Sequence, residues 1–515
     1  MTAHDVLSDA ITARKLTEEE PLREYPPPQE PPPSDAPAAP EPAPPEPQHN
    51  LPRAIEQFKQ PWLAGEAPTL RLCAVRIQGL REVRPSFLSA LCRPYVDVTS
   101  GVTSLGAWWY GQRASFALPG EPATFKSLLD ITAAIGSDMA RLDLVRDIAA
   151  SLEPSQLSSG NPEEDVDIIL RVKPSKRFFL KTNTSVGQSE GTASIQGKIR
   201  NVLGGAETLE GSATLGTRTR HAYNLTFTTP VLASPDVWAN VSALAQHRDL
   251  TGFISAHEGQ HALRAAVMMM SGDGIRNELA YEASHRHFHH LLPGASVAIR
   301  RLAKPSFKSS LTYTVENDTR DDPFMTTSGS YWRGALEYAG LGGDTSFLKA
   351  EGYATLARAF GNGWAWSLGA RTGWMHTLDE RPAYLNDRFM LGGPTDVRMF
   401  RLNSLGPRQK YDSLGGDAFW AAGASLLAPI PARPEWPLKF HIFANAGQLT
   451  QAQSYQRGLP ASYTELLQPS ASMGLGLLFQ QGPVRLELNF GLPVLARRSD
   501  GTRKGLQFGI GLEFL

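Results

Sequence analysis

The feature that most constrains the fold is a two-residue alternation of apolar and polar side chains in the carboxy-terminal two thirds of the chain. The final segment LQFGIGLEFL (506–515) alternates without an error, and VRLELNFGL (484–492) repeats the pattern. Alternation of this kind indicates strands whose two faces meet different surroundings. We count about sixteen such segments from residue 177 onward, joined by Gly/Asn/Asp/Ser clusters or longer polar loops.

The number and length of these segments favour a transmembrane barrel. Barrel strands need only about 9–11 residues each to cross a membrane, and they alternate lipid-facing with lumen-facing side chains. A soluble sandwich or solenoid is the alternative, but the many small residues on the polar face suit a wide lumen. The expected fold class is therefore an all-β transmembrane barrel of about sixteen antiparallel strands over 177–515, preceded by one small α/β domain.

The small domain is expected over residues 69–175. TLRLCAVRIQG (69–79) alternates like a strand, RPSFLSALCRPY (84–95) is typical of a short helix, and 125–154 carries apolar residues at helical spacing. EDVDIILRVKP (164–174) closes the domain as a second strand. Residues 1–60 are expected to be a disordered, proline-rich and acidic tail, because the segment cannot bury enough apolar surface to order itself.

Charge and composition exclude several classes of protein. The net charge of −1 and the isoelectric point near 6.9 argue against a nucleic-acid binder. The 2 cysteines, Cys73 and Cys92, cannot form a disulfide framework, and buried thiols are favoured over a single bridge. The first twenty residues lack the basic start and apolar run of a secretory signal, and they are too acidic for a cleaved transit peptide.

The segment HEGQH (257–261) has the spacing of a zinc hydrolase motif, with two histidines as ligands and Glu258 as general base. The motif requires a helix, because on a strand the two histidines sit roughly 13 Å apart. Gly259 and the strand-like neighbours oppose a helix, and no third ligand is evident. We expect a polar strand end here, and likewise for HRHFHH (285–290), so that no metal site and no enzyme are predicted.

Several motifs together resemble the BamA-type superfamily of barrel assembly proteins, over residues 69 to 515. They are NVLGGAETL (201–209), LGGPTDVRMF (391–400), FANAGQL (443–449) and QQGPVRLELNFGLP (480–493), with IQGLREVRPSFL and LDLVRDIAASLEP in a POTRA-like domain. The chain has room for only one POTRA repeat and lacks a secretory signal. It therefore resembles most the core barrel subunits of the mitochondrial sorting and assembly machinery, with a plastid relative as the alternative.

The resemblance implies a location, partners and a function. The barrel should lie in the mitochondrial outer membrane with its POTRA domain in the intermembrane space. Its partners should be β-barrel precursor proteins, peripheral subunits of the machinery and the lipid bilayer, with no nucleic acid and no cofactor. It should fold and insert barrel precursors, and a passive or polypeptide-conducting pore is the alternative function.

The resemblance also implies a latch in an inward-folded loop over residues 378–416. Its residues are Gly392, Gly393, Asp396, Arg398 and Phe400 of the loop, with Asn445 on the barrel wall. Two positions depart from the family pattern. Met399 replaces a glycine, so the local backbone or packing should differ, and Asn445 replaces an acid, so Arg398 should gain only a neutral hydrogen-bond partner.

The expected working element is a lateral seam between the first and last strands. An opened seam would offer a free strand edge, and such an edge is a template for another strand. The first strand (RFFLKTNTSVG) has a poor lipid face, and the last strand contains glycines. The expected seam residues are Phe178, Leu180, Thr182 and Thr184 of the first strand, and Gln507, Gly509, Gly511, Leu512 and Phe514 of the last.

Overall fold

The computed structural model describes residues 69–96, 119–155, 164–187, 190–323, 325–379, 383–431, 433, 436–451, 464–481 and 484–511. The acidic proline-rich tail expected over 1–60 lies outside these residues. Among the described helices, none has the length and apolar character needed to cross a membrane. The described chain contains an α/β domain and a large antiparallel sheet, which are taken in turn.

The α/β domain pairs a four-stranded sheet with two helices. Its elements are β1 (Thr69–Gln78), α3 (Pro85–Val96), β2 (Pro122–Thr124), α6 (Phe125–Arg141), β3 (Val145–Pro154) and β4 (Asp165–Pro174). The sheet order is β2-β1-β4-β3, with β1 and β4 parallel and the outer pairs antiparallel. This arrangement is the expected POTRA domain.

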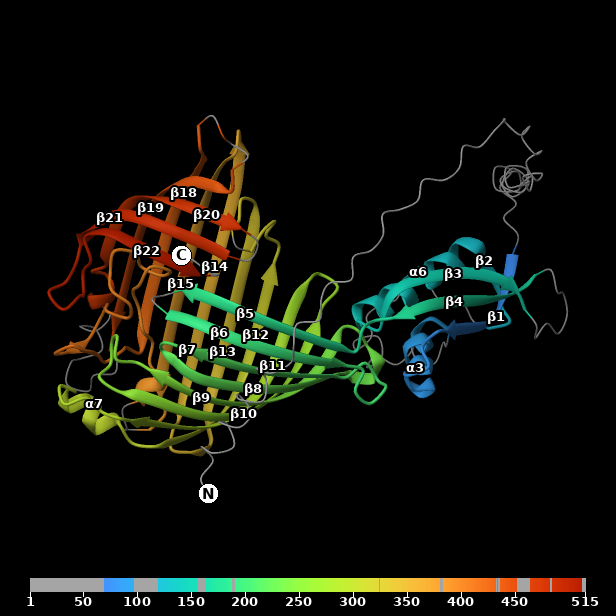
Figure 1. Ribbon diagram of the computed structural model, residues 1–515, viewed down its shortest axis with the longest axis horizontal. Coiled ribbons are helices and arrows are strands. Elements are labelled where there is room, and N and C mark those ends of the chain that lie inside the picture. Colours follow the sequence, from blue (N-terminus) through green and yellow to red (C-terminus); the bar gives the residue numbers. More distant parts are fainter. Residues whose placement is uncertain are drawn as a thin grey trace, which may run out of the picture. The chain divides into compact units, whose positions relative to one another are not determined.

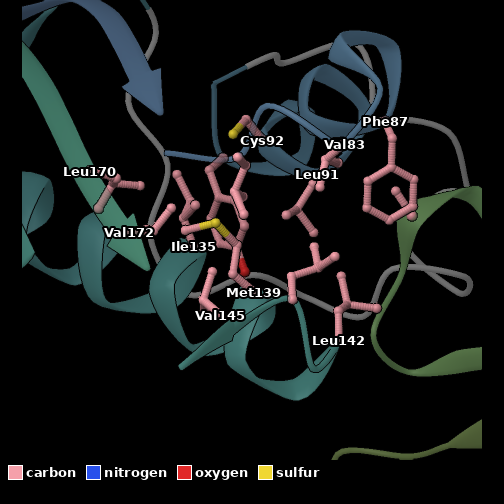
Figure 2. Close-up of a cluster of buried hydrophobic side chains, with 14 of the residues drawn as sticks. Val83, Phe87, Leu91, Cys92, Ile135, Met139, Leu142, Val145, Leu170 and Val172 are labelled. Carbon is pink, nitrogen blue, oxygen red and sulfur yellow. The ribbon is translucent and has the colours of Figure 1, made fainter. Parts of the chain in front are cut away.

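The core of this domain lies between the helices and the sheet. Leu91 of α3, Ile135 and Met139 of α6 and Leu170 of β4 point toward one another in Figure 2 and are almost fully buried. Cys92 belongs to the same cluster, where burial and, secondarily, the charge of Asp138 raise its pKa to about 11. Both cysteines are free, as expected, although Cys73 is only partly buried.

The helix expected over 125–154 proved wrong in its second half. Helix α6 ends at Arg141, and residues 145–154 form strand β3, which pairs with β4. Val145, Ile148 and Leu152 recur at helical spacing, but a bulge near Val145 and partial burial produce the same spacing in a strand. Asp143, with φ of 58°, turns the chain between the two elements.

The large sheet contains 16 strands, all antiparallel to their neighbours, in agreement with the expected barrel (Figure 1). The strands are β5 (Phe178–Gly187), β6 (Glu190–Arg200), β7 (Thr208–Gly216), β8 (Thr219–Pro230), β9 (Val237–Asp249), β10 (His257–Met270), β11 (Ile275–His289), β12 (Ser306–Asp318), β13 (Gly329–Gly343), β14 (Phe347–Gly361), β15 (Trp364–Thr377), β18 (Ala418–Pro429), β19 (Leu438–Thr450), β20 (Ser470–Gln481), β21 (Val484–Leu495) and β22 (Gly505–Gly511).

Short elements interrupt this succession at three places. They are η1 (Val231–Ala233) between β8 and β9, α7 (Val297–Leu302) between β11 and β12, and η2 (Leu385–Asp387) with the hairpin β16 (Arg408–Gln409) and β17 (Asp412–Ser413) between β15 and β18. The last group belongs to the long loop expected at 378–416, which separates neighbouring strands without breaking their order.

The alternation of side chains along the strands distinguishes the two faces of the barrel wall. Along β10, Leu263 and Val267 are exposed, whereas Arg264 forms an ion pair with Glu278 of β11 on the opposite face. Other residues of that second face contact the long loop, so it is the lumen face. The exposed apolar residues therefore form the outer, lipid-facing surface.

The zinc motif lies on a strand, as expected. His257, Gly259 and His261 of β10 share the outer face, while Glu258 points to the lumen side and hydrogen-bonds Asn386 of the loop. Within the described ranges, no group of three or more His, Cys, Asp or Glu residues is placed to hold a metal ion. The segment 285–290 likewise forms the end of β11 and the start of a loop.

Candidate functional site in the inward loop and at the sheet ends

The loop between β15 and β18 makes a tight turn that two glycines permit. Gly392 and Gly393 have φ of 101° and 144°, values that residues with a Cβ rarely adopt. Asp396 closes the turn, because one of its carboxylate oxygens accepts a hydrogen bond from the backbone N–H of Gly392 at 3.0 Å. The backbone N–H of Gly393 also donates to the carbonyl of Val397 at 3.2 Å. The turn presents the next residues to the barrel wall.

Arg398 is fully buried and binds the wall through its whole guanidinium group. Its Nη1 donates to Asn445 Oδ1 on β19 at 3.1 Å, which is the contact expected from the sequence. Its Nε and Nη2 donate to the two carboxylate oxygens of Glu487 on β21, at 3.0 and 3.2 Å. Phe443 lies beside the guanidinium, with its ring centre 5.2 Å from Cζ.

Glu487 corrects the expectation that Arg398 lacks a charged partner. The carboxylate is fully buried and also accepts hydrogen bonds from Arg485 at 2.5 Å and Asn489 at 2.8 Å. A buried guanidinium without a counter-charge would destabilise the docked loop. The bidentate ion pair with Glu487 offsets that cost and allows Arg398 to be buried. The sequence contained a signal for it, since Arg485, Glu487 and Asn489 occupy consecutive lumen-facing positions of one strand.

Met399 has a backbone conformation that glycine adopts most readily. Its φ is 64°, in the left-handed region, and its side chain is fully buried. The departure from glycine therefore places a buried side chain on a left-handed backbone, which is strained for any residue with a Cβ. Gly491 makes room for the methionine, since a Cβ on that glycine would lie 3.0 Å from the Met399 sulfur.

The same loop tip binds the last strand. Gln507 of β22 accepts a hydrogen bond from the N–H of Met399 at 2.8 Å and donates one to the carbonyl of Phe400 at 3.1 Å. The N–H of Arg503, just before β22, donates to the Met399 carbonyl at 2.9 Å. Gln507 was assigned to the seam alone, but its side chain joins the latch to the seam strand.

A second set of contacts fixes the loop to β10 and β11 and to the segments just before β10 and α7. Asp387 binds the buried Arg286 with two hydrogen bonds, of 2.5 and 3.0 Å, and Asn386 binds Glu258. Asp412 accepts hydrogen bonds from the backbone N–H groups of Ser255 and Ser296, each at 2.7 Å. The loop is therefore held at two separate parts of the barrel.

The first and last strands are the ends of the sheet. The strand order begins at β22 and finishes at β5, and no backbone pairing joins these two strands among the residues described. They nevertheless come within contact of each other. Backbone N–H and C=O groups along such a junction are available to another strand.

Most of the expected seam residues lie on the two end strands. Phe178 and Leu180 are 73% and 71% exposed, and Thr182 and Thr184 on the same face are exposed too. On β22, Gln507 and Gly509 are buried on the lumen side. Gly511 is the last residue of β22 and pairs with Arg485, whereas Leu512 and Phe514 lie outside the described residues.

Comparisons with known proteins agree with this architecture. Residues 201–514 match the Omp85 superfamily domain. The SAM50-like protein of Schizosaccharomyces pombe is 35% identical, over 86% of this chain and 90% of the relative. The sorting and assembly machinery component 50 homolog of Bos taurus is 30% identical, over 73% of this chain and 81% of the relative.

A solved structure supports the fold independently. The crystal structure of BamA from Haemophilus ducreyi lacking POTRA domains 1–3 superposes with a TM-score of 0.68, covering 86% of this chain and 85% of that one, at 13% identity. Because the identity is low, this likeness concerns the fold alone. The sequence matches show that the chain belongs to the SAM50 family of β-barrel assembly factors in the Omp85 superfamily.

Proposed function

We propose that this assembly factor folds and inserts β-barrel precursors into the mitochondrial outer membrane through a lateral seam between β5 and β22. The barrel lies in that membrane, and the POTRA domain faces the intermembrane space. Its partners are unfolded barrel precursors and peripheral subunits of the sorting and assembly machinery. The observation that carries the proposal is the junction between β5 and β22, which lacks a backbone ladder among the described residues.

A precursor strand is recognised at this junction by its backbone. An unpaired N–H or C=O group in hydrocarbon costs several kcal/mol, so a strand edge inside a membrane is a strong template. A precursor strand added to β5 satisfies those groups, and each bond made to the precursor replaces one that the barrel or water supplied. The exchange needs neither a cofactor nor covalent chemistry, because hydrogen bonds that are broken are remade.

The latch gives the seam a defined resting state. Gln507 holds β22 to the loop tip, and Arg398 holds the loop tip to β19 and β21. Release of β22 from β5 therefore leaves β22 attached to the rest of the barrel. The edge that opens toward a precursor is β5, whose exposed residues have no comparable anchor to the loop among the described contacts.

The test is to lock the seam with a disulfide. A panel of cysteine pairs scans β5 against β22, in a Cys73→Ser background that retains the buried Cys92. Purified protein in liposomes receives an unfolded barrel precursor, and the protease-resistant folded product is measured. Oxidised pairs across the seam should bind precursor yet produce little folded product, and reduction should restore the yield.

A matched control locks a junction that is already paired. Thr182 of β5 lies opposite Ile195 of β6, and these two strands are already paired. A cysteine pair at these positions therefore adds a crosslink without closing the seam. This control should retain the unlocked yield. Full precursor maturation in completely crosslinked seam variants would refute the lateral route and favour passage through the lumen.

A further inference from the structure

Histidines are concentrated on one part of the outer barrel surface. Of the 12 histidines in the chain, seven share the lipid-facing side of β8–β11, as their cross-strand register shows. They are His221 of β8, His247 of β9, His257 and His261 of β10, and His285, His287 and His289 of β11. We call these seven residues the histidine patch.

The rings of the histidine patch form a continuous layer. The ring centroids of His221 and His247 are 4.5 Å apart, and those of His247 and His289 are 5.3 Å apart. The rings of His287 and His289 are also separated by 5.3 Å. Neighbouring imidazoles therefore line up across four strands instead of being scattered over the wall.

Gly259 explains how one ring fits into this layer. It faces His247 on one side and His287 on the other, and a Cβ built on it would lie 2.4 Å from the His287 ring. The glycine of HEGQH therefore provides space for an imidazole from the next strand. The motif that suggested zinc chemistry is instead part of a packed surface of rings.

The histidine patch lies at the end of the strands away from the POTRA domain. Asp236, in the connection between β8 and β9 at the other end, forms an ion pair with Arg141 of α6. Along the outer face toward that end, the side chains become apolar, with Leu263, Val267 and Leu279 all exposed. The rings thus occupy the level at which a lipid-facing surface meets the headgroup region, where amphipathic rings are favoured.

The available groups suit a phosphate. Nδ1 of His287 and Nδ1 of His289 are buried and have no hydrogen-bond partner within the described residues. Arg220, at a bulge in β8, is close enough to act electrostatically on His289 and on Asp249. Asp249 is the acid that faces this surface, and its carboxylate is 3.9 Å from His257 Nε2. Ring N–H donors beside a guanidinium favour an anion over a cation.

We propose that the histidine patch with Arg220 binds the headgroup phosphate of an anionic phospholipid, on the membrane face opposite the POTRA domain. The bound lipid fixes the height of β8–β11 in the bilayer. This inference rests on the barrel lying in a membrane and not on exchange at the seam. A failed seam experiment therefore leaves it intact, and the reverse also holds.

The test measures lipid binding to the purified full chain. Delipidated protein is titrated with phosphatidylinositol or phosphatidylcholine, and bound lipids are counted by native mass spectrometry in the presence of EDTA. Basic residues near a membrane surface each improve anionic lipid binding by about fivefold. Arg220 supplies that charge, so the wild type should prefer phosphatidylinositol by about fivefold, and His285→Gln/His287→Gln/His289→Gln, which removes ring donors that hold the phosphate beside Arg220, should lose most of that preference.

Two further variants make the result specific. His376→Gln alters an outward histidine of β15, stacked on Trp374, and should leave the preference unchanged. Gly259→Ala keeps every histidine but displaces the His287 ring, so it should weaken the preference. Heat-modifiable migration in gels confirms that each barrel is folded. A preference for phosphatidylinositol that survives in the triple variant overturns the proposal, and so does a preference that disappears when EDTA is added. Millimolar inorganic phosphate should weaken lipid binding in the wild type more than in the triple variant, and an equal effect on the two proteins also overturns the proposal.

Discussion

At the scale of single residues, the charge of Glu487 decides how firmly the loop is held. Glu487→Gln would leave Arg398 and Arg485 buried without a counter-charge, which costs about 4 kcal/mol. Asn445→Ala removes one hydrogen bond to a charged group, at about 2 kcal/mol. We therefore expect the larger loss of stability for Glu487→Gln, measured as the free energy of urea unfolding in lipid bilayers. Glu316→Gln, in a partly exposed pair with Arg276, should change it little.

Met399 provides a second prediction, because strain and packing oppose each other there. Replacement by glycine relieves a left-handed conformation worth about 1–2 kcal/mol, but it removes a buried methionine side chain worth about 2–5 kcal/mol. Alanine keeps the strain and loses most of the packing. The stability of the docked loop should therefore fall in the order Met, Gly, Ala, as measured by trypsin cleavage within the loop. A glycine variant more resistant than the wild type would show that strain outweighs packing.

At the scale of elements, the sequence predicts strands that are apolar along one whole face. It does not predict contacts between residues that are far apart in the chain. The alternation of apolar and polar residues correctly predicted the barrel. Gly259 and the strand-like neighbours correctly predicted that 257–261 is a strand and not a helix. Helix α6 was extended too far because β3 owes its conformation to pairing with β4, which local spacing does not encode. Glu487 was missed for the same reason, since 89 residues separate it from Arg398 and only the fold brings them together.

Asp412 makes the hold of the β16–β17 hairpin dependent on pH. Burial acts to raise the pKa of its carboxyl, but hydrogen bonds from Ser255 and Ser296 outweigh it and lower that pKa below the ordinary 3.8. A lowered pKa contributes stability that is fully present above 3.8 and is lost as the pH falls through the lowered value. Protease cleavage in the loop should therefore rise in wild type only in strong acid. Asp412→Asn should be cleaved faster already at pH 7, with no further acid step from this residue.

At the scale of the whole molecule, the loop is a brace across the lumen and a connection to the seam. One end is anchored to β10 and β11 by Asn386 and Asp387, and its tip is anchored to β19, β21 and β22 by Arg398 and Met399. Asp387 and Arg398 are charged and buried from water, so their ion pairs are costly to break singly. A barrel braced in this way is suited to working at its wall.

This brace predicts the electrical behaviour of the barrel and separates an insertase from a pore. In planar bilayers the wild type should show small and infrequent openings, because the loop occupies the lumen. Arg398→Ala or Asp387→Ala removes one anchor and should increase openings modestly, since the other anchor still holds the loop. The double variant should give more frequent and larger openings than the sum of the two single effects, because it weakens the loop at both attachments at once. A large and stable open state in the wild type would instead favour a conducting pore, since a lumen that is already open needs no seam to admit a polypeptide.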